Sequence, residues 1–312
     1  MKLKKCIFAV LGFVLIFSGC STQKPKIPNN IKMEEKGGVV QPVLSVYNTN
    51  TEKIEQMPLE SYVLGVVAGE MDGSFPAEAL KAQAVLARTY ALHFVATKES
   101  KYDGADISTD IEEAQAYAPE KINDAITDAV AETQGKVLSV GDNFIEAWFY
   151  SNSGGKTAST KESFVGNEND PEFVKVVSSP ENETNSKNAV WSAWFSRSEI
   201  LNALAKMGKE VSSVSKISAG NVGPSGRAIT LKFGNDEIST PEFRLAIGST
   251  KFKSSLITNI KVDNAGVTFS GKGYGHGVGL SQWGAKVLAE DGNDYIDILN
   301  HYFNNIKIAD LY

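Results

Sequence analysis

The sequence has few of the residues that bind metal ions or form disulfides: two cysteines and three histidines in 312 residues. Zinc sites in proteins use three or four ligands, which are commonly Cys and His side chains. His93, His276 and His301 are far apart in the sequence, and no two of them have the spacing of a metal-binding motif. We therefore expect no metal ion and no other cofactor.

Basic charge is also scarce, with 31 Lys and Arg against 37 Asp and Glu and a formal net charge of −6. Binding of nucleic acid depends on clustered Lys and Arg that neutralise phosphates. The composition therefore argues against nucleic acid as a partner. A polysaccharide would have to be recognised locally, in a cleft, and not through the overall charge of the protein.

The first twenty residues have the features of an export signal. Lysines precede an apolar run from Ile7 to Phe17, and the tetrapeptide Phe17-Ser18-Gly19-Cys20 resembles the lipobox of bacterial lipoproteins. The resemblance implies that residues 1–19 are a lipoprotein signal peptide and that Cys20 carries the lipid. The alternative is an uncleaved anchor, but the apolar run is shorter than the roughly 20 residues of a spanning helix.

Cleavage would also change the exported chain. It would remove Cys6, and acylation would occupy the Cys20 thiol, so that no disulfide could form. The formal net charge would change from −6 to −9, because the signal contains three lysines and no acid. Residues 20–40 are expected to form the lipid anchor and a tether. They would hold a domain of residues 41–312 at the extracytoplasmic face of the plasma membrane.

The pattern of apolar residues predicts helices and strands in irregular order, which indicates an α+β fold with antiparallel strands. Pro58 is expected to open a helix that Gly69 ends, and Pro76 to open a largely buried helix from Ala77 to about Ala96. Further helices are expected at about 119–134, after a capping box at 196–199, and at 280–291 and 294–303. Strands are expected at 39–47, 136–140, 143–151, 256–263 and 267–270. Residues from about 196 to 250 could form a small inserted subdomain.

Glu70 lies between the first two predicted helices, both of which are apolar. Burial of a carboxyl group against apolar helices disfavours its charged form and lets it keep a proton near neutral pH. The simpler alternative is a solvated residue at a helix end. Asp72 could act as a second carboxylate, although Asp72-Gly73-Ser74 is typical of an ordinary turn. Glu78, in the first turn of the next helix, is expected to complement the helix dipole.

A glycine-rich segment, residues 271–284, contains six glycines and is followed by a predicted helix. It lacks the pattern of a phosphate-binding loop, and its glycine spacing does not match the dinucleotide-binding fingerprint. Such a segment can bring its backbone close to a ligand. Each of these features also has a purely structural interpretation, as a tight connection or as a histidine with satisfied hydrogen bonds.

Four segments together resemble the stage II sporulation protein D family, which is also described as the amidase-enhancer family. They are Gly69-Glu70 with residues 76–89 (PAEALKAQAVLART), residues 151–155 (SNSGG), residues 243–248 (FRLAIG) and residues 273–285 (GYGHGVGLSQWGA). The resemblance extends from about residue 43 to the C-terminus. Some family members bind zinc through Cys and His near the Ser-Gly-Gly loop, but this chain has neither there. We therefore expect hydrogen bonds to hold the loop.

The sporulation members of that family are lytic transglycosylases of peptidoglycan. They prefer glycan strands stripped of stem peptides and leave an anhydro-muramyl end. The resemblance implies that Glu70 is the catalytic acid here and that glycan strands are the substrate. The alternatives are a non-catalytic cell-wall-binding protein that stimulates a partner amidase or another wall hydrolase, and a structural lipoprotein of the cell envelope.

The substrate-binding residues expected from these segments are candidates to contact the sugar rings or their hydroxyl and acetamido groups. Arg88 could instead be a surface charge beside the core, and core packing is an alternative for the aromatic residues, above all for Trp148. The expected substrate-binding residues are Arg88, Ser151, Ser153, Tyr274, Gly275, His276, Gly277, Ser281, Gln282 and Trp283.

Overall fold

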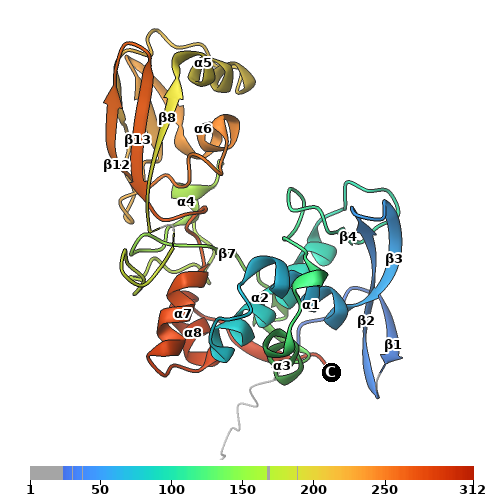
Figure 1. Ribbon diagram of the computed structural model, residues 1–312. Coiled ribbons are helices and arrows are strands. Elements are labelled where there is room, and N and C mark those ends of the chain that lie inside the picture. The colour runs from blue at the N-terminus through green and yellow to red at the C-terminus, as the bar shows by residue number, and fades with distance from the viewer. Residues whose placement is uncertain (1–23, 30, 37, 167–168, 188) are drawn as a thin grey trace, which may run out of the picture.

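The computed structural model describes residues 24–29, 31–36, 38–166, 169–187 and 189–312. The predicted signal peptide and the lipidation site at Cys20 lie outside these residues. The α+β prediction is confirmed, because the described chain forms eight α-helices and several small, mostly antiparallel sheets. Figure 1 shows two lobes, one around α1, α2, α7 and α8 and the other around β8, β12, β13, α5 and α6.

The first lobe is built around helix α2, which is buried on most sides. Pro58 and Pro76 stand at the N-caps of α1 and α2, where the missing N–H of proline costs no helical hydrogen bond. One sheet has the order β1-β2-β3 with β4 parallel to β2, and another has the order β15-β5-β6. The elements are β1 (Lys32–Lys36), β2 (Val39–Asn48), β3 (Lys53–Pro58), α1 (Leu59–Glu70), α2 (Ala77–Thr97), β4 (Ile107–Ser108), a 3-10 turn η1 (Pro119–Lys121), α3 (Asp124–Glu132), β5 (Lys136–Val140), β6 (Asn143–Phe144), α7 (Gln282–Glu290), α8 (Tyr295–Tyr302) and β15 (Lys307–Asp310).

The second lobe has a hydrophobic core of its own, which runs from Trp191 to Phe269 and centres on phenylalanine rings. Its sheets have the orders β12-β13-β8 and β11-β10-β9. The sequence suggested an inserted subdomain at about 196–250, but strands β8, β12 and β13 extend this unit on both sides. The elements are β8 (Val190–Ser196), α5 (Arg197–Lys206), β9 (Ile217–Ala219), β10 (Thr230–Phe233), β11 (Asp236–Ser239), α6 (Thr240–Ile247), β12 (Ile257–Val262) and β13 (Gly266–Lys272).

A loop-rich layer joins the two lobes, and the chain crosses it twice. It contains β7 (Phe149–Tyr150), α4 (Thr160–Ser163) and β14 (Leu280–Ser281), and β7 pairs with β14 in parallel. The predicted strand over 143–151 is therefore wrong as one element. It divides into β6 and β7, which belong to different sheets, because the chain passes from the core of the first lobe into this layer.

Two other expectations need correction. The helix predicted at 119–134 is a 3-10 turn followed by α3, because the side chain of Asn123 accepts a hydrogen bond from the Ile126 N–H and caps a new helix there. Ile122, between the two elements, is exposed. The predicted tether to residue 40 also ends too late, since β1 pairs with β2 through residues 32–36.

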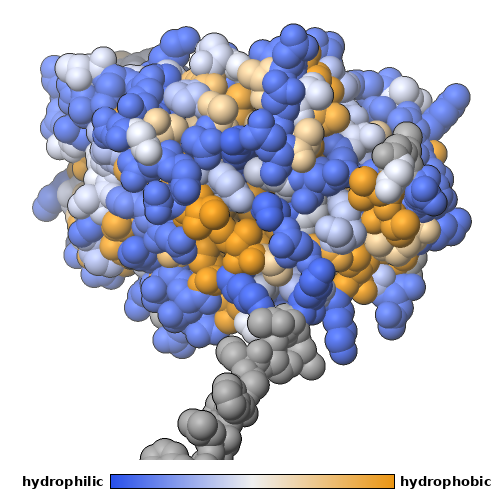
Figure 2. Space-filling model, turned by 90° about the horizontal axis from the view of Figure 1, so that it is seen from below, coloured by the Kyte–Doolittle hydropathy of each residue, from blue (hydrophilic) through white to orange (hydrophobic). Residues whose placement is uncertain are grey.

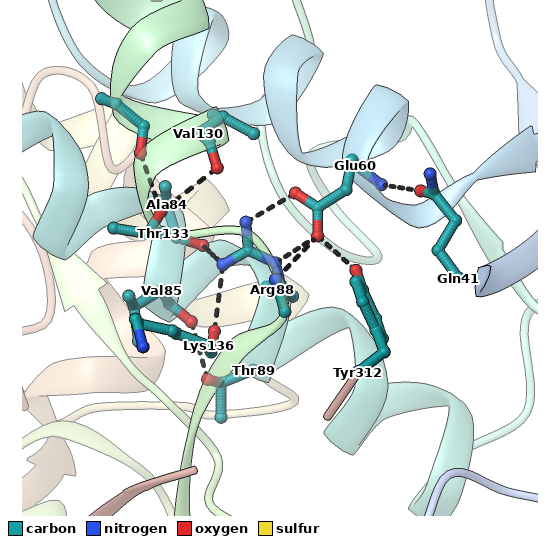
Figure 3. Close-up of polar contacts among 12 residues, drawn as sticks. Gln41, Glu60, Ala84, Val85, Arg88, Thr89, Val130, Thr133, Lys136 and Tyr312 are labelled. Carbon is teal, nitrogen blue, oxygen red and sulfur yellow. Dashed lines mark hydrogen bonds and ion pairs between the residues drawn. The ribbon is translucent and has the colours of Figure 1, made fainter. Parts of the chain in front are cut away.

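The most buried charges of the first lobe form one ion pair between α1 and α2 (Figure 3). Arg88 donates from Nε and Nη2 to the two carboxylate oxygens of Glu60, at 2.8 and 2.6 Å. Tyr312 also donates to Glu60, as does the Gly135 N–H at 3.3 Å. The remaining Arg88 nitrogen, Nη1, donates to the Lys136 carbonyl at 3.0 Å. This network joins α1, α2, β5 and the C-terminal residue.

Figure 2 shows the molecule from below, where hydrophilic residues cover most of the face and hydrophobic residues gather in separate areas, one of them near the centre. Within the described ranges, no helix is long and apolar enough to cross a membrane.

Replacement of Arg88 by Ala should lower the free energy of unfolding by about 3–5 kcal/mol, because it leaves the Glu60 carboxylate buried without its cation. The double variant E60L/R88M should lose much less, since no charge remains unpaired. Urea unfolding at pH 7 measures both. The matched control is K272A, which breaks the exposed pair with Glu183 and should cost much less. Equal losses in R88A and K272A would contradict this account.

Candidate functional site

Glu70 is the last residue of α1, and a close backbone contact holds its carboxylate. A Cβ atom on the preceding residue, Gly69, would lie 2.7 Å from the Ala116 backbone. Because residue 69 has no side chain, the segment 116–117 can cross the end of the helix at this distance. The Ala116 N–H then donates to Glu70 Oε1 at 2.7 Å.

The environment of Glu70 changes the pKa of its carboxyl group. Desolvation by burial raises this pKa above its ordinary value, as the sequence predicted. Hydrogen bonds from the Ala116 N–H and from the Gln282 side chain act in the opposite direction, because they stabilise the carboxylate. The net direction is upward, so Glu70 holds its proton to a higher pH than an exposed glutamate does.

Asp72 has the opposite shift only two residues away. The Ser74 N–H and hydroxyl both donate to Asp72 Oδ1, at 3.0 and 2.8 Å, and these bonds lower the pKa of its carboxyl group. Asp72 is therefore an ionised turn residue. The pKa of Glu70 is raised and that of Asp72 is lowered, so Glu70 is suited to donate a proton while Asp72 stays an anion.

A pocket of about 520 Å³ opens beside Glu70. The end of α1 and the following turn form one side, and Lys121 and Asn123 form the other. The Asn123 side-chain amide donates to the Gly73 carbonyl at 3.3 Å and holds the turn against the start of α3. This volume is within the range of about 300–1,000 Å³ that is common for ligand pockets.

The C-terminal end of the glycine-rich segment reaches this site. Gln282, the first residue of α7, donates to Gln83 Oε1 of α2 at 3.4 Å and also bonds Glu70. Trp283 packs edge-on against Phe75, with ring centroids 5.1 Å apart. The Ser281 hydroxyl caps α7 and donates to the buried Glu181, so it does not face the pocket. The structure thus brings Gln282 to Glu70, while Trp283 packs on Phe75 in the segment that follows.

The front half of the segment lies elsewhere. His276 lines a separate pocket of about 90 Å³ together with Arg244 and Phe164. Its Nε2–H donates to the Phe149 carbonyl at 3.0 Å, and its Nδ1 accepts from the Val278 N–H at 3.1 Å. Burial lowers the pKa of the imidazole to about 3, so the ring is neutral. Both ring nitrogens are engaged, which gives the side chain a structural role.

The neighbours of His276 are also tightly packed. A Cβ atom on Gly275 would lie 2.6 Å from the Tyr150 side chain, and one on Gly277 would lie 2.7 Å from the Arg227 guanidinium. Tyr274 exchanges backbone hydrogen bonds with Asn152. These glycines therefore serve close packing within the protein.

The loop at 151–155 is held by two buried charges that the sequence did not reveal. Glu181 accepts from the Ser153 N–H at 2.7 Å, and Arg227 donates to the Ser153 carbonyl at 2.8 Å. Ser153 is fully buried, and the Ser151 carbonyl accepts from the Trp283 N–H. Hydrogen bonds therefore hold this loop. Within the described part of the chain, no group of three or more His, Cys, Asp or Glu is placed to hold a metal ion.

Arg88 does not reach the pocket. It is fully buried, and its guanidinium is committed to Glu60 and to backbone carbonyls. The prediction that it contacts substrate is therefore corrected, because no donor of this residue faces solvent.

Arg227 and Glu181 could have been suspected only from isolated charges beside glycine-containing turns, which is a weak signal.

Comparison with known proteins gives consistent matches. A family model described as stage II sporulation protein matches residues 47–139, and a model of a domain of unknown function matches residues 142–279. The chain is 30% identical to Stage II sporulation protein D of Bacillus subtilis, over 94% of this chain and 88% of that protein. It is 32% identical to Stage II sporulation protein D of Bacillus amyloliquefaciens, over 85% and 78%. It is 31% identical to an amidase enhancer of Bacillus subtilis, over 77% of this chain but 39% of that protein.

Titration of the carboxyl carbons by NMR should find the pKa of Glu70 above, and that of Asp72 below, the ordinary values for these residue types. Gln282→Leu should raise the pKa of Glu70 further, because it removes a donor to the carboxylate. The pKa of Asp72 should not change in this variant and serves as the internal control. A lower pKa for Glu70 in Q282L would contradict the geometry described.

Proposed function

Because the chain belongs to the stage II sporulation protein D family, we propose that it acts on the bacterial cell wall as a peptidoglycan lytic transglycosylase with Glu70 as its catalytic acid. The observation that carries the proposal is the half-buried Glu70 carboxyl, with a raised pKa, at the wall of a 520 Å³ pocket. Perturbed carboxyl groups in pockets are candidates for proton transfer.

The chemistry needs one carboxyl group in two protonation states. Protonated Glu70 donates to the glycosidic oxygen as the C–O bond breaks, and the leaving sugar departs as an alcohol. The resulting carboxylate then accepts the proton of the 6-hydroxyl of the remaining sugar, and that oxygen bonds to C1 to close the anhydro ring. Glu70 regains its proton, so no water is consumed. The two hydrogen bonds from Ala116 and Gln282 support the carboxylate that exists between these steps.

The geometry favours this reaction over a hydrolysis that uses two carboxyl groups. Glycoside hydrolases usually place a second carboxylate across the substrate, as nucleophile or base. Asp72 is the nearest candidate, but its Oδ1 accepts two bonds from Ser74 within its own turn. In the transglycosylase reaction the substrate's own hydroxyl replaces the second carboxylate, so one acid is sufficient.

We also propose that a lipid on Cys20 holds this enzyme at the extracytoplasmic face of the plasma membrane. The lipobox-like sequence before Cys20 supports this placement. In cells fed a labelled fatty acid, the protein should incorporate label and lose it in Cys20→Ser. Label that persists in C20S would overturn the lipidation proposal and leave the role of Glu70 unaffected.

Glu70→Gln should abolish the release of anhydro-ended fragments from purified glycan strands without stem peptides, as measured by mass spectrometry. Asp72→Asn, the matched control in the same pocket, should keep most of the activity. E70Q should be at least as stable as the wild type at pH 7. Because the pKa of Glu70 is raised in the folded state, protonation of Glu70 stabilises the fold at low pH. This stabilisation is lost as the pH rises through the raised folded pKa, whereas Gln has no charge to desolvate.

Equal cleavage by E70Q and the wild type would show that Glu70 is not the acid. If the wild type binds these strands but releases no product, the protein is not a lytic transglycosylase. The alternative, a non-catalytic protein that stimulates an amidase, then replaces this proposal.

A further inference from the structure

A second pocket, of about 410 Å³, lies at the far end of α2 from Glu70. His93 of α2 and Phe144 of β6 lie on one side of it, and Trp148 and Phe173 on the other. His93 is 16 residues beyond Ala77, which corresponds to about 24 Å along an α-helix. The two pockets share no lining residue and are separate sites.

The floor of this pocket is an aromatic surface that its neighbours hold in place. The Trp148 ring lies between Phe164 and Phe173, with centroid distances of 5.2 and 5.7 Å. Trp148 is only partly buried, and its indole N–H bonds none of the described residues. Phe164 in turn packs against His276 at 5.2 Å, so the ring system is anchored in the layer between the lobes. A fixed aromatic face with an indole N–H at its edge is suited to a ligand that is apolar on one side and polar at its rim.

The rim of the pocket carries both donors and acceptors. Asn143, Glu146, Glu172 and His93 line it. Burial lowers the pKa of His93, which keeps the imidazole neutral near pH 7. The Glu146 carboxylate is paired with Lys98 at 2.6 Å, which offsets its charge. Among the described lining residues there is no Lys or Arg, and the nearby Lys98 ammonium is paired with Glu146.

We propose that this pocket is a second glycan-binding site, which takes one or two uncharged N-acetylated sugar rings. A pyranose ring presents an apolar C–H face to an aromatic surface, while its hydroxyl and acetamido groups at the edge need donors and acceptors together. An ammonium ligand would use the carboxylates but would leave the Trp148 N–H and the Asn143 amide without partners. The site goes beyond the proposed cleavage at Glu70, because it would hold the strand or the wall at a distance from the bond that is cut.

Tryptophan indole signals in NMR can test the two pockets separately. The chain has four tryptophans: besides Trp148, Trp283 packs on Phe75, Trp191 is buried and Trp194 is exposed on β8. The probe is the trimer of N-acetylglucosamine. The Trp148 signal should shift saturably, and the Trp194 signal should not move. Release of anhydro-ended fragments from glycan strands reports the Glu70 site independently, so failure of one proposal can be distinguished from failure of the other.

Two substitutions extend the test without risk to the core. Glu172 is exposed, and E172A should weaken trimer binding at Trp148 by about tenfold through loss of charge-assisted hydrogen bonds. The matched control E120A removes an exposed glutamate outside this pocket and should leave binding unchanged. A saturable shift of Trp148 that is weakened in E172A supports the proposal.

Two results would overturn it: no shift of Trp148, or a Trp148 shift that lysine amide produces and the sugar does not. The last result would make the pocket an amine site.

Discussion

The buried ion pair between Glu60 and Arg88 is the interaction on which the proposed site depends. It fixes α1 against α2, and the site uses the far end of α1 for Glu70 and the middle of α2 for Gln83. A buried pair stabilises a structure only when its remaining hydrogen-bonding atoms find partners. Here Tyr312, Gly135 and the Lys136 carbonyl provide them, so the C-terminal residue also belongs to the support of the site.

In the layer between the lobes, buried charged side chains are likewise held by hydrogen bonds. Arg227 and Glu181 are buried apart from one another, and each is satisfied mainly by the backbone and by serine hydroxyls. They hold the loop at 151–155 beside the start of α7. Because α7 carries Gln282 to Glu70, the order of this loop bears directly on the proposed chemistry. A protein without metal ligands in this loop can therefore still fix its position.

Much of the first lobe could be predicted from the sequence, since proline at both helix starts and the apolar stripes of α1 and α2 are local signals. The position and raised pKa of Glu70 follow from the same signals. The failures were long-range. Arg88 has the same position in the helical repeat of α2 whether its side chain faces solvent or pairs with the buried Glu60, which lies 28 residues earlier in the sequence. The periodicity of apolar residues therefore cannot distinguish these two environments. Glu70 and His276 were both expected at the site because both lie in family motifs, but they line two different pockets.

The glycine that precedes Glu70 shows how backbone packing can set a proton affinity. Desolvation alone would raise the pKa of a carboxyl group until it no longer ionised. Such a group could donate a proton to the glycosidic oxygen, but it could not act as the carboxylate that accepts the proton of the 6-hydroxyl in the second step of the proposed reaction. The Ala116 N–H limits the rise, and it reaches Glu70 only because residue 69 has no Cβ atom. A larger residue at 69 would push segment 116–117 away and leave only Gln282 to oppose the effect of burial. In the proposed chemistry, Gly69 thus adjusts the acid strength of Glu70.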